Sequence, residues 1–136
     1  STVSKFQRIQ NALARIVLLS DGRAHSEPLL HQLHWLPVHS RIRFKLATIT
    51  YNALASSSPT YLSGLLHPYQ PARNLRSSDQ QLILTRKPST TNFGSRAFQS
   101  TAPSVWNSIP LGVRAAPSIS AFKRSLKTHY FCHPPA

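Results

Sequence analysis

The sequence predicts a small, mainly α-helical domain with one short β-hairpin. Apolar residues recur at helical spacing in several segments. Eleven prolines against four glycines break the chain into short elements. Only the region around residues 81–98 alternates in a way that suits strands. With 136 residues and a hydrophobic fraction of 40%, the chain has material for one modest core.

The first predicted helix covers residues 3–19 and is amphipathic. Its apolar residues share one face at helical spacing, and they are Phe6, Ile9, Leu13, Ile16 and Val17. Asp21-Gly22 has the chemistry of a turn, so we expect the helix to end there.

Two further helices are expected before residue 60. Ser26 can cap a short helix that stops near Trp35-Leu36-Pro37. Residues 39–55 carry two apolar stripes, which predict a central helix buried on two sides. The β-branched run at residues 48–50 also suits a strand. Residues 59–66 suit one more short helix.

A loop is expected over residues 67–80, because proline, asparagine and serine are frequent there. Residues 81–86 and 93–98 are expected to pair as a β-hairpin around a loop at 89–92. Trp35 and Trp106 each stand beside a proline-bounded turn, and we expect both to be core anchors.

For the last part of the chain, the sequence predicts a brief helix at residues 103–109 and a final helix from Pro117 to Phe131. The inward face of the final helix is expected to hold Ile119, Phe122, Leu126 and Tyr130. We therefore expect a single basic domain over residues 1–131, in a chain that looks like part of a longer protein, and a frayed tail at 132–136.

Charge is the most informative property of the composition. Sixteen Lys and Arg stand against three acids, Asp21, Glu27 and Asp79, for a formal net charge of +13. Such a field attracts polyanions. The scattered acids disfavour hydrolytic and metal-dependent chemistry, which uses carboxylates in pairs. We therefore expect no enzymatic activity and no cofactor, and we predict nucleic acid as a partner.

The candidate nucleic-acid-binding residues are polar and mostly basic side chains of three helices and the loop region. They are Lys5, Arg8, Arg15, Arg41, Lys45, Thr48, Asn52, Arg73, Arg76, Arg96, Lys123, Arg124 and Lys127. Lys and Arg neutralise phosphates, and Arg can contact them at two points. The alternative is an ordinary solvated surface. Tyr69, Phe93 and Phe98 are interleaved with the loop cations, where they can stack bases or anchor the core.

Metal and thiol chemistry are weak alternatives. His31, His34 and His39 lie close in sequence, as do His129, Cys132 and His133, but structural zinc sites usually take several cysteines. The single cysteine excludes an internal disulfide and favours an intracellular protein. No stretch approaches the ~20 apolar residues of a membrane span, and the N-terminal segment does not read as a signal peptide. We expect neither a metal nor a membrane partner.

Six segments resemble one known family in order and approximate spacing. They are residues 33–38 with 41–45, residues 59–62, 75–79, 94–98, 106–110 and 122–128. The resemblance is to the C-terminal region of LINE-type (non-LTR) retrotransposon polyproteins of animals, and it covers residues 5–131. It implies a place downstream of a reverse transcriptase domain. The polymerase motif Tyr-x-Asp-Asp is missing, and one cysteine cannot build the zinc knuckle found in some relatives.

Three hypotheses follow. The first is a non-catalytic accessory region of a retrotransposon reverse transcriptase that binds RNA or an RNA–DNA duplex through the backbone, with weak sequence discrimination. The second is a protein-interaction module that docks on the polymerase domain. The third is a translated relic without selected function, which would unfold with poor cooperativity. A role at an anionic membrane surface is the least favoured.

Overall fold

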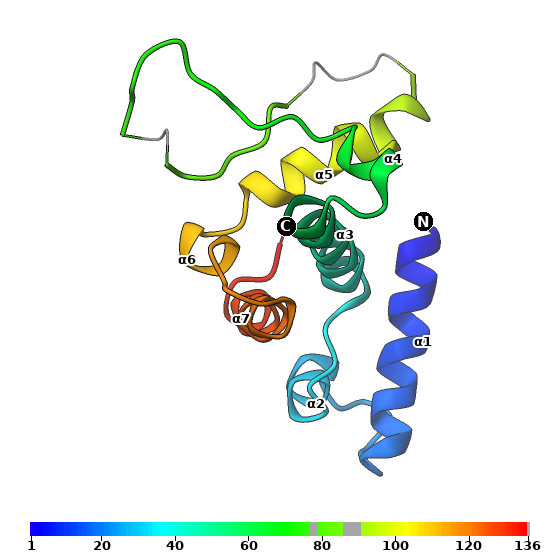
Figure 1. The fold of residues 1–136 in the computed structure, drawn as a ribbon. Helices are drawn as coiled ribbons and strands as arrows, with labels where there is room; N and C mark the ends of the chain where they lie inside the picture. The colour runs from blue at the N-terminus through cyan, green and yellow to red at the C-terminus, as the bar shows by residue number, and fades with distance from the viewer. Residues whose placement is uncertain (77–78, 86–90, 136) are drawn as a thin grey trace. The chain divides into compact units, whose positions relative to one another are not determined.

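The computed structural model describes residues 1–76, 79–85 and 91–135. Within these residues the chain forms seven α-helices and one 3₁₀ helix, so the prediction of a mainly α-helical protein is confirmed (Figure 1). The elements are α1 (Thr2–Val17), α2 (Ser26–Gln32), α3 (Val38–Ser56), α4 (Thr60–Ser63), η1 (Gly94–Arg96), α5 (Phe98–Asn107), α6 (Leu111–Arg114) and α7 (Ile119–Cys132).

The chain divides into two compact units. The first unit comprises Ser1–Arg43 and Lys127–Ala136, and the second comprises Phe44–Leu126. Both α3 and α7 contribute residues to each unit. The single domain expected over residues 1–131 stays a prediction.

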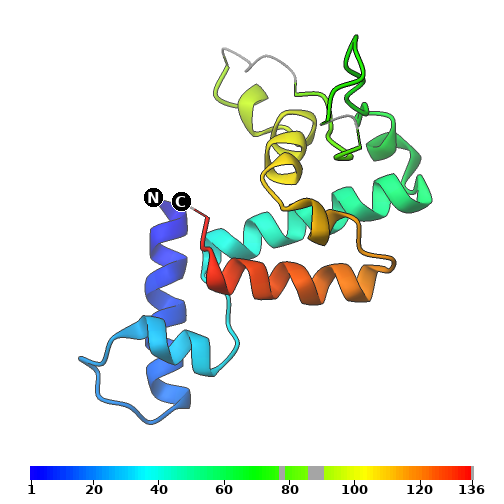
Figure 2. The same ribbon diagram turned by 90° about the vertical axis from the view of Figure 1, so that its left-hand side faces the viewer.

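Amide side chains of α1 hydrogen-bond the backbone at the start of α3. Gln10 is buried, and its Nε2 donates to the carbonyl oxygen of Leu36 at 2.9 Å. The Oε1 of Gln7 accepts from the backbone N–H of Val38 at 2.8 Å. Val38 begins α3, so Gln7 satisfies an N–H that the helix itself leaves without a partner. Helix α2 packs on α1 (Figures 1 and 2), with Ala14 and Leu30 buried.

Helix α1 ends earlier than the sequence predicts. It stops at Val17 rather than at Asp21-Gly22. Leu19 adopts a left-handed backbone with φ 50°, and its N–H donates to the carbonyl of Ile16 while that of Ser20 donates to Arg15. These bonds satisfy the last carbonyls of the helix before the glycine is reached. Residues 21–22, which the sequence marked as the end of the helix, therefore lie in the loop after it.

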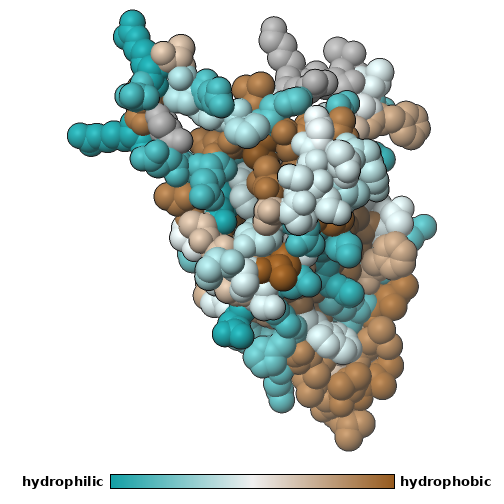
Figure 3. All heavy atoms as spheres, viewed as in Figure 1, coloured by the Kyte–Doolittle hydropathy of each residue, from teal (hydrophilic) through white to brown (hydrophobic). Residues whose placement is uncertain are grey.

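The apolar face that the sequence predicted for α1 is exposed. All five residues of the predicted stripe keep about half of their surface in solvent or more; they are Phe6, Ile9, Leu13, Ile16 and Val17. Hydrophobic side chains gather over α1 in Figure 3. The physical reason is that α1 packs through another side, where Gln10 and Ala14 are buried. We call the five exposed side chains the α1 stripe.

Three stacked rings form the centre of the second unit. Tyr51 of α3 and Phe122 of α7 stack with ring centroids 4.5 Å apart, and Trp106 of α5 lies 5.8 Å from Phe122. Figure 2 shows α3 and α7 running side by side. Trp106 is buried as predicted, whereas Trp35 is only half-buried. The predicted inward positions Phe122, Leu126 and Tyr130 are buried.

Helix α3 continues without a break through the β-branched residues 48–50. The hydroxyls of Thr48 and Thr50 donate to the carbonyls of Phe44 and Leu46 at 2.8 Å, which satisfies these polar groups inside the helix. Both threonines are consequently buried. Ile42 and Leu54, each from one of the two predicted apolar stripes, are exposed instead. Most of the buried positions in α3 are occupied by alanine, serine or threonine rather than by large apolar residues.

The β-hairpin is not found in the described residues, which contain no strand longer than an isolated bridge. Residues 94–96 form η1 and Phe98 begins α5, so the second predicted strand is wrong. Residues 86–90, which include the end of the first strand and part of the loop, lie outside the described residues. Ile83 instead pairs with Pro68 in one antiparallel bridge.

Side chains of α5 take the place of a strand partner. Asn107 donates through Nδ2 to the carbonyl of Ile83 at 2.8 Å and accepts from its N–H at 2.9 Å. Trp106 Nε1 donates to the carbonyl of Gln81 at 2.9 Å. Because these groups satisfy the backbone of the 81–83 segment, it needs no second strand at those positions.

Candidate nucleic-acid interface

The predicted basic residues of the first unit are only partly free for a ligand. Lys5 and Arg8 on α1 and Arg41 on α3 are exposed. Lys127 is half-buried. Arg15 is half-buried as well, and its Nε donates to the carbonyl of Ala24 at 3.0 Å. Arg15 therefore ties the end of α1 to the loop that follows, and this structural role is one the sequence did not indicate.

In the second unit most of the predicted binding residues are exposed, and Thr48 is the exception. Lys45 and Asn52 on α3, and Lys123 and Arg124 on α7, are at the surface. Thr48 is buried, and its hydroxyl already donates within the helix. The hydroxyl proton of Thr48 is therefore not available to a phosphate oxygen, and contact of Thr48 with nucleic acid stays a prediction that its burial does not favour.

The loop region presents cations and aromatic rings to solvent. Arg73, Arg76 and Arg96 are exposed. Phe93 is 87% exposed and Tyr69 is 40% exposed, so neither is the core anchor that the sequence favoured. Phe98 is half-buried at the start of α5. The segment between α4 and η1 also carries many hydrophilic side chains in Figure 3. Exposed aromatics among cations are typical of surfaces on which bases stack.

The three acids do not compensate these cations. Asp21, Glu27 and Asp79 are all exposed, and Asp21 accepts a hydrogen bond from the backbone N–H of Arg23 at 3.2 Å. Each unit therefore has exposed basic side chains of its own and few carboxylates to balance them.

Histidines of α2, α7 and the residues that follow these two helices pack against other rings. His31 lies edge-on to Phe131 with centroids 5.2 Å apart, and His129 stacks on His133 at 5.4 Å. Burial, and then the charge of His133, lower the pKa of His129. Among the described residues no group of three or more potential metal ligands is close enough to hold an ion. Cys132 is a free, exposed thiol.

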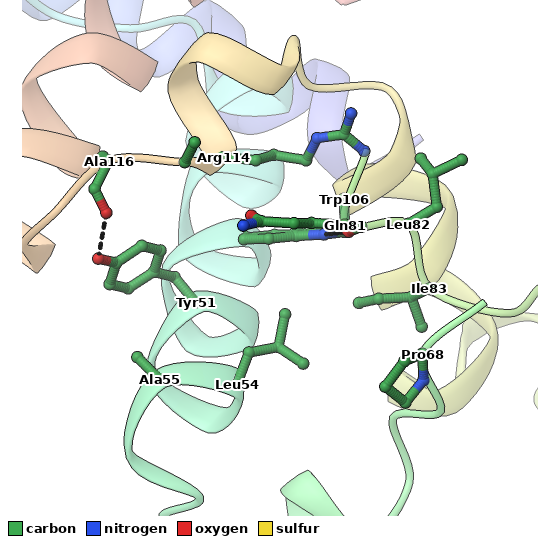
Figure 4. A pocket seen from close by; sticks show the side chains of 11 residues that line it. Tyr51, Leu54, Ala55, Pro68, Gln81, Leu82, Ile83, Trp106, Arg114 and Ala116 are labelled. Carbon is green, nitrogen blue, oxygen red and sulfur yellow. Dashed lines mark hydrogen bonds between the residues drawn. The ribbon is translucent and has the colours of Figure 1, made fainter. Parts of the chain in front are cut away.

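Arg114 is a residue that the sequence analysis missed. It ends α6 in a four-residue helix after Pro110, and only 5% of its surface is exposed. It lines a cavity in the second unit together with Tyr51 and Trp106 (Figure 4). An arginine next to a proline-bounded turn gives no sequence signal of burial, because surface arginines occupy the same contexts.

No family model, curated protein or solved structure matches this chain. In the part of the chain that the structure describes, no helix has the length and apolar character needed to cross a membrane.

Proposed function

We propose that this chain binds the phosphate backbone of RNA or of an RNA–DNA duplex without catalysing a reaction, as an accessory region beside a reverse transcriptase domain. The observation that carries the proposal is the set of exposed cations in both units of a chain with net charge +13. Binding of this kind gains free energy mainly from the release of counterions condensed on the nucleic acid.

The chemistry differs between the helices and the loop region. Lys45, Lys123 and Arg124 stand on helices of the second unit, where they can contact phosphates. Phe93 and Tyr69 can stack unpaired bases beside the loop cations. Neither group reads base edges, so we expect affinity to depend weakly on sequence. Unpaired bases are needed for stacking, which favours RNA with loops over regular duplexes.

The test is equilibrium binding of fluorescently labelled stem-loop RNA over a range of salt concentrations. If about six phosphates of single-stranded segments are neutralised, the plot of log K against log salt should have a slope near −4, at about 0.7 per phosphate. A flat response would contradict the proposal.

Matched variants locate the interface. Lys45→Gln and Lys123→Gln each remove one exposed charge from a predicted position, and each is expected to reduce the slope by about 0.7. Arg23→Gln removes one exposed charge at a position outside the predicted set and is the control. Equal effects of all three variants would mean that the chain attracts RNA only through its total charge.

Phe93→Ala tests base stacking. The ring is almost fully exposed, so folding should not change. We expect weaker binding of stem-loop RNA and unchanged binding of a regular RNA–DNA duplex, since stacked bases are worth about 1–3 kcal/mol each. Unchanged binding of both ligands would exclude Phe93 from the interface.

The α1 stripe favours a second candidate function, that of a module which docks on a protein. Its members Phe6, Ile9, Leu13 and Ile16 follow the 3-4-3 spacing of a helix seam. The family resemblance suggests the polymerase domain as the partner. A helix that buries amides and exposes five large apolar side chains has the character of an incomplete interface.

Pull-down experiments separate the two candidates. Phe6→Asp or Ile16→Asp should abolish capture of a polymerase domain and should change RNA binding no more than a control substitution of the same charge. Ser4→Asp places the same charge in the first turn of α1 at an exposed position outside the stripe, where an acid suits the helix dipole, and it is the control. Capture that survives both stripe substitutions would exclude α1 as the docking surface.

A further inference from the structure

A cavity of about 410 Å³ lies within the second unit. Its walls come from the end of α3, the 81–83 segment, α5 and the turn after α6; they include Tyr51, Leu54, Ala55, Trp106 and Arg114 (Figure 4). This volume falls within the range of about 300–1,000 Å³ that is usual for small-molecule sites. The cavity is therefore large enough for an organic ligand rather than a single water molecule.

The polar groups of the aromatic walls already have partners. The Tyr51 hydroxyl donates to the carbonyl of Ala116 at 2.7 Å, and the Trp106 indole donates to the carbonyl of Gln81 at 2.9 Å. Both rings therefore offer the cavity apolar surface, and neither hydroxyl nor indole N–H is left for a ligand.

Arg114 is different. Its Nε and Nη1 are buried and have no hydrogen-bond acceptor among the described residues. Burial lowers the pKa of the guanidinium, yet an arginine keeps its proton in proteins. Two buried N–H donors of a cation without an acceptor are costly, and the three acids of the chain are all exposed. Figure 4 shows the guanidinium above the ring of Trp106 at one side of the cavity.

From the cavity and the two unpartnered nitrogens of Arg114, Nε and Nη1, we propose that the second unit binds a small organic anion, in which a carboxylate or phosphate is joined to an apolar, preferably flat, body. The anionic group accepts hydrogen bonds from Arg114. The body packs between Tyr51, Leu54 and Trp106. The proposal goes beyond nucleic-acid binding and does not rest on it.

The experiment uses the whole chain and four probes. Phenyl phosphate and benzoate carry both parts of the proposed ligand, benzamide is the neutral analogue of benzoate, and inorganic phosphate has no apolar body. Binding is followed by the NMR shift of the Trp106 indole N–H, which Trp35→Phe distinguishes from the other indole. Phenyl phosphate, benzoate or both should shift this resonance and saturate, whereas benzamide and inorganic phosphate should have little effect at the same concentrations.

Variants test the role of each wall. Arg114→Met should weaken binding of the anionic probes by about 10- to 100-fold, as expected for loss of a charged hydrogen bond. Arg114→Lys should recover part of it. Arg23→Met removes one exposed charge outside the cavity and is the control. If Arg114→Met fails to fold, Ala55→Phe decides, because Ala55 is an exposed residue of the wall and the larger side chain should block entry.

Three results would overturn the proposal. They are the absence of any saturable shift with phenyl phosphate and benzoate, equal binding of benzamide and benzoate, and full binding by folded Arg114→Met. If Arg114→Met does not fold, full binding by Ala55→Phe has the same meaning.

Discussion

Two identical chemical changes, Tyr130→Phe and Tyr51→Phe, should shift stability in opposite directions. The Tyr130 hydroxyl is buried and has no partner among the described residues. A buried hydroxyl without a partner costs about 1–3 kcal/mol. Phenylalanine keeps the ring and removes that cost, but it leaves a small void. We therefore expect Tyr130→Phe to stabilise the chain by about 1 kcal/mol.

Tyr51 provides the matched control. Its hydroxyl donates to the Ala116 carbonyl at 2.7 Å, so Tyr51→Phe removes a hydrogen bond that is worth about 0.5–1.5 kcal/mol. The difference between the two variants should then be about 2 kcal/mol, which is large against the 5–15 kcal/mol stability of a typical domain.

Urea unfolding measures this difference, with far-UV circular dichroism and tryptophan fluorescence as probes. Trp35 reports on the first unit, which contains Tyr130, and Trp106 reports on the second, which contains Tyr51. The midpoint should rise for Tyr130→Phe and fall for Tyr51→Phe at an unchanged m-value. A fall of similar size in both variants would refute the reasoning, because it would mean that the Tyr130 hydroxyl has a partner.

The same hydroxyl predicts a pH dependence. Burial raises the pKa of Tyr130, and the charge of Arg43 opposes that shift in part. The folded chain thus holds the phenol proton more tightly than the unfolded chain. This contribution to stability is complete below the ordinary tyrosine pKa of about 10 and declines as pH rises above it. Tyr130→Phe should remove this part of the alkaline loss of stability.

Three further predictions concern a helix end, a side-chain clamp and a histidine pair. Leu19 is 93% exposed with φ 50°, so Leu19→Gly should relieve a strain of about 1 kcal/mol and raise Tm by several degrees; a lower Tm would contradict this. Asn107→Ala leaves both backbone groups of Ile83 without partners, and hydrogen exchange of the Ile83 amide should accelerate; unchanged protection would exclude the clamp. The lowered pKa of His129 means that its contribution to stability is lost as pH falls below about 6.5, and His133→Ala should raise this pKa in an NMR titration, whereas an unchanged value would exclude the pairing.

The helices could be predicted because their signals are local. Helix α2 begins at Ser26, close to where the sequence placed its start, although His25 and not Ser26 is the N-cap and no side chain caps the helix. The spacing of Phe122, Leu126 and Tyr130 marks the buried face of α7. Periodicity shows which face of a helix is apolar, but not whether another element covers it. In α1 the apolar face is exposed and another face is packed, because the amides of Gln7 and Gln10 bond the segment that leads into α3.

The cavity and the missing hairpin depend on contacts between residues far apart in the chain. Asn107 bonds Ile83 across 24 positions, and no pattern near residue 83 indicates that a side chain replaces a strand. Arg114 is buried where the turn around α6 brings it to the cavity that Trp106 and Tyr51 also line. Composition and spacing carry no information about such packing. Of the candidate site, the sequence could identify the exposed cations but not the buried one.

In the described part of the segment between α4 and η1, Pro68 and Ile83 form an antiparallel β-bridge, and side chains of α5 bond the backbone of Gln81 and Ile83. Ala72 and Arg73 are exposed. Extending a loop between fixed ends costs only about 0.6 kcal/mol for each doubling of its length. An epitope or a fluorescent peptide inserted between Ala72 and Arg73 should therefore be accommodated without disturbing the helices.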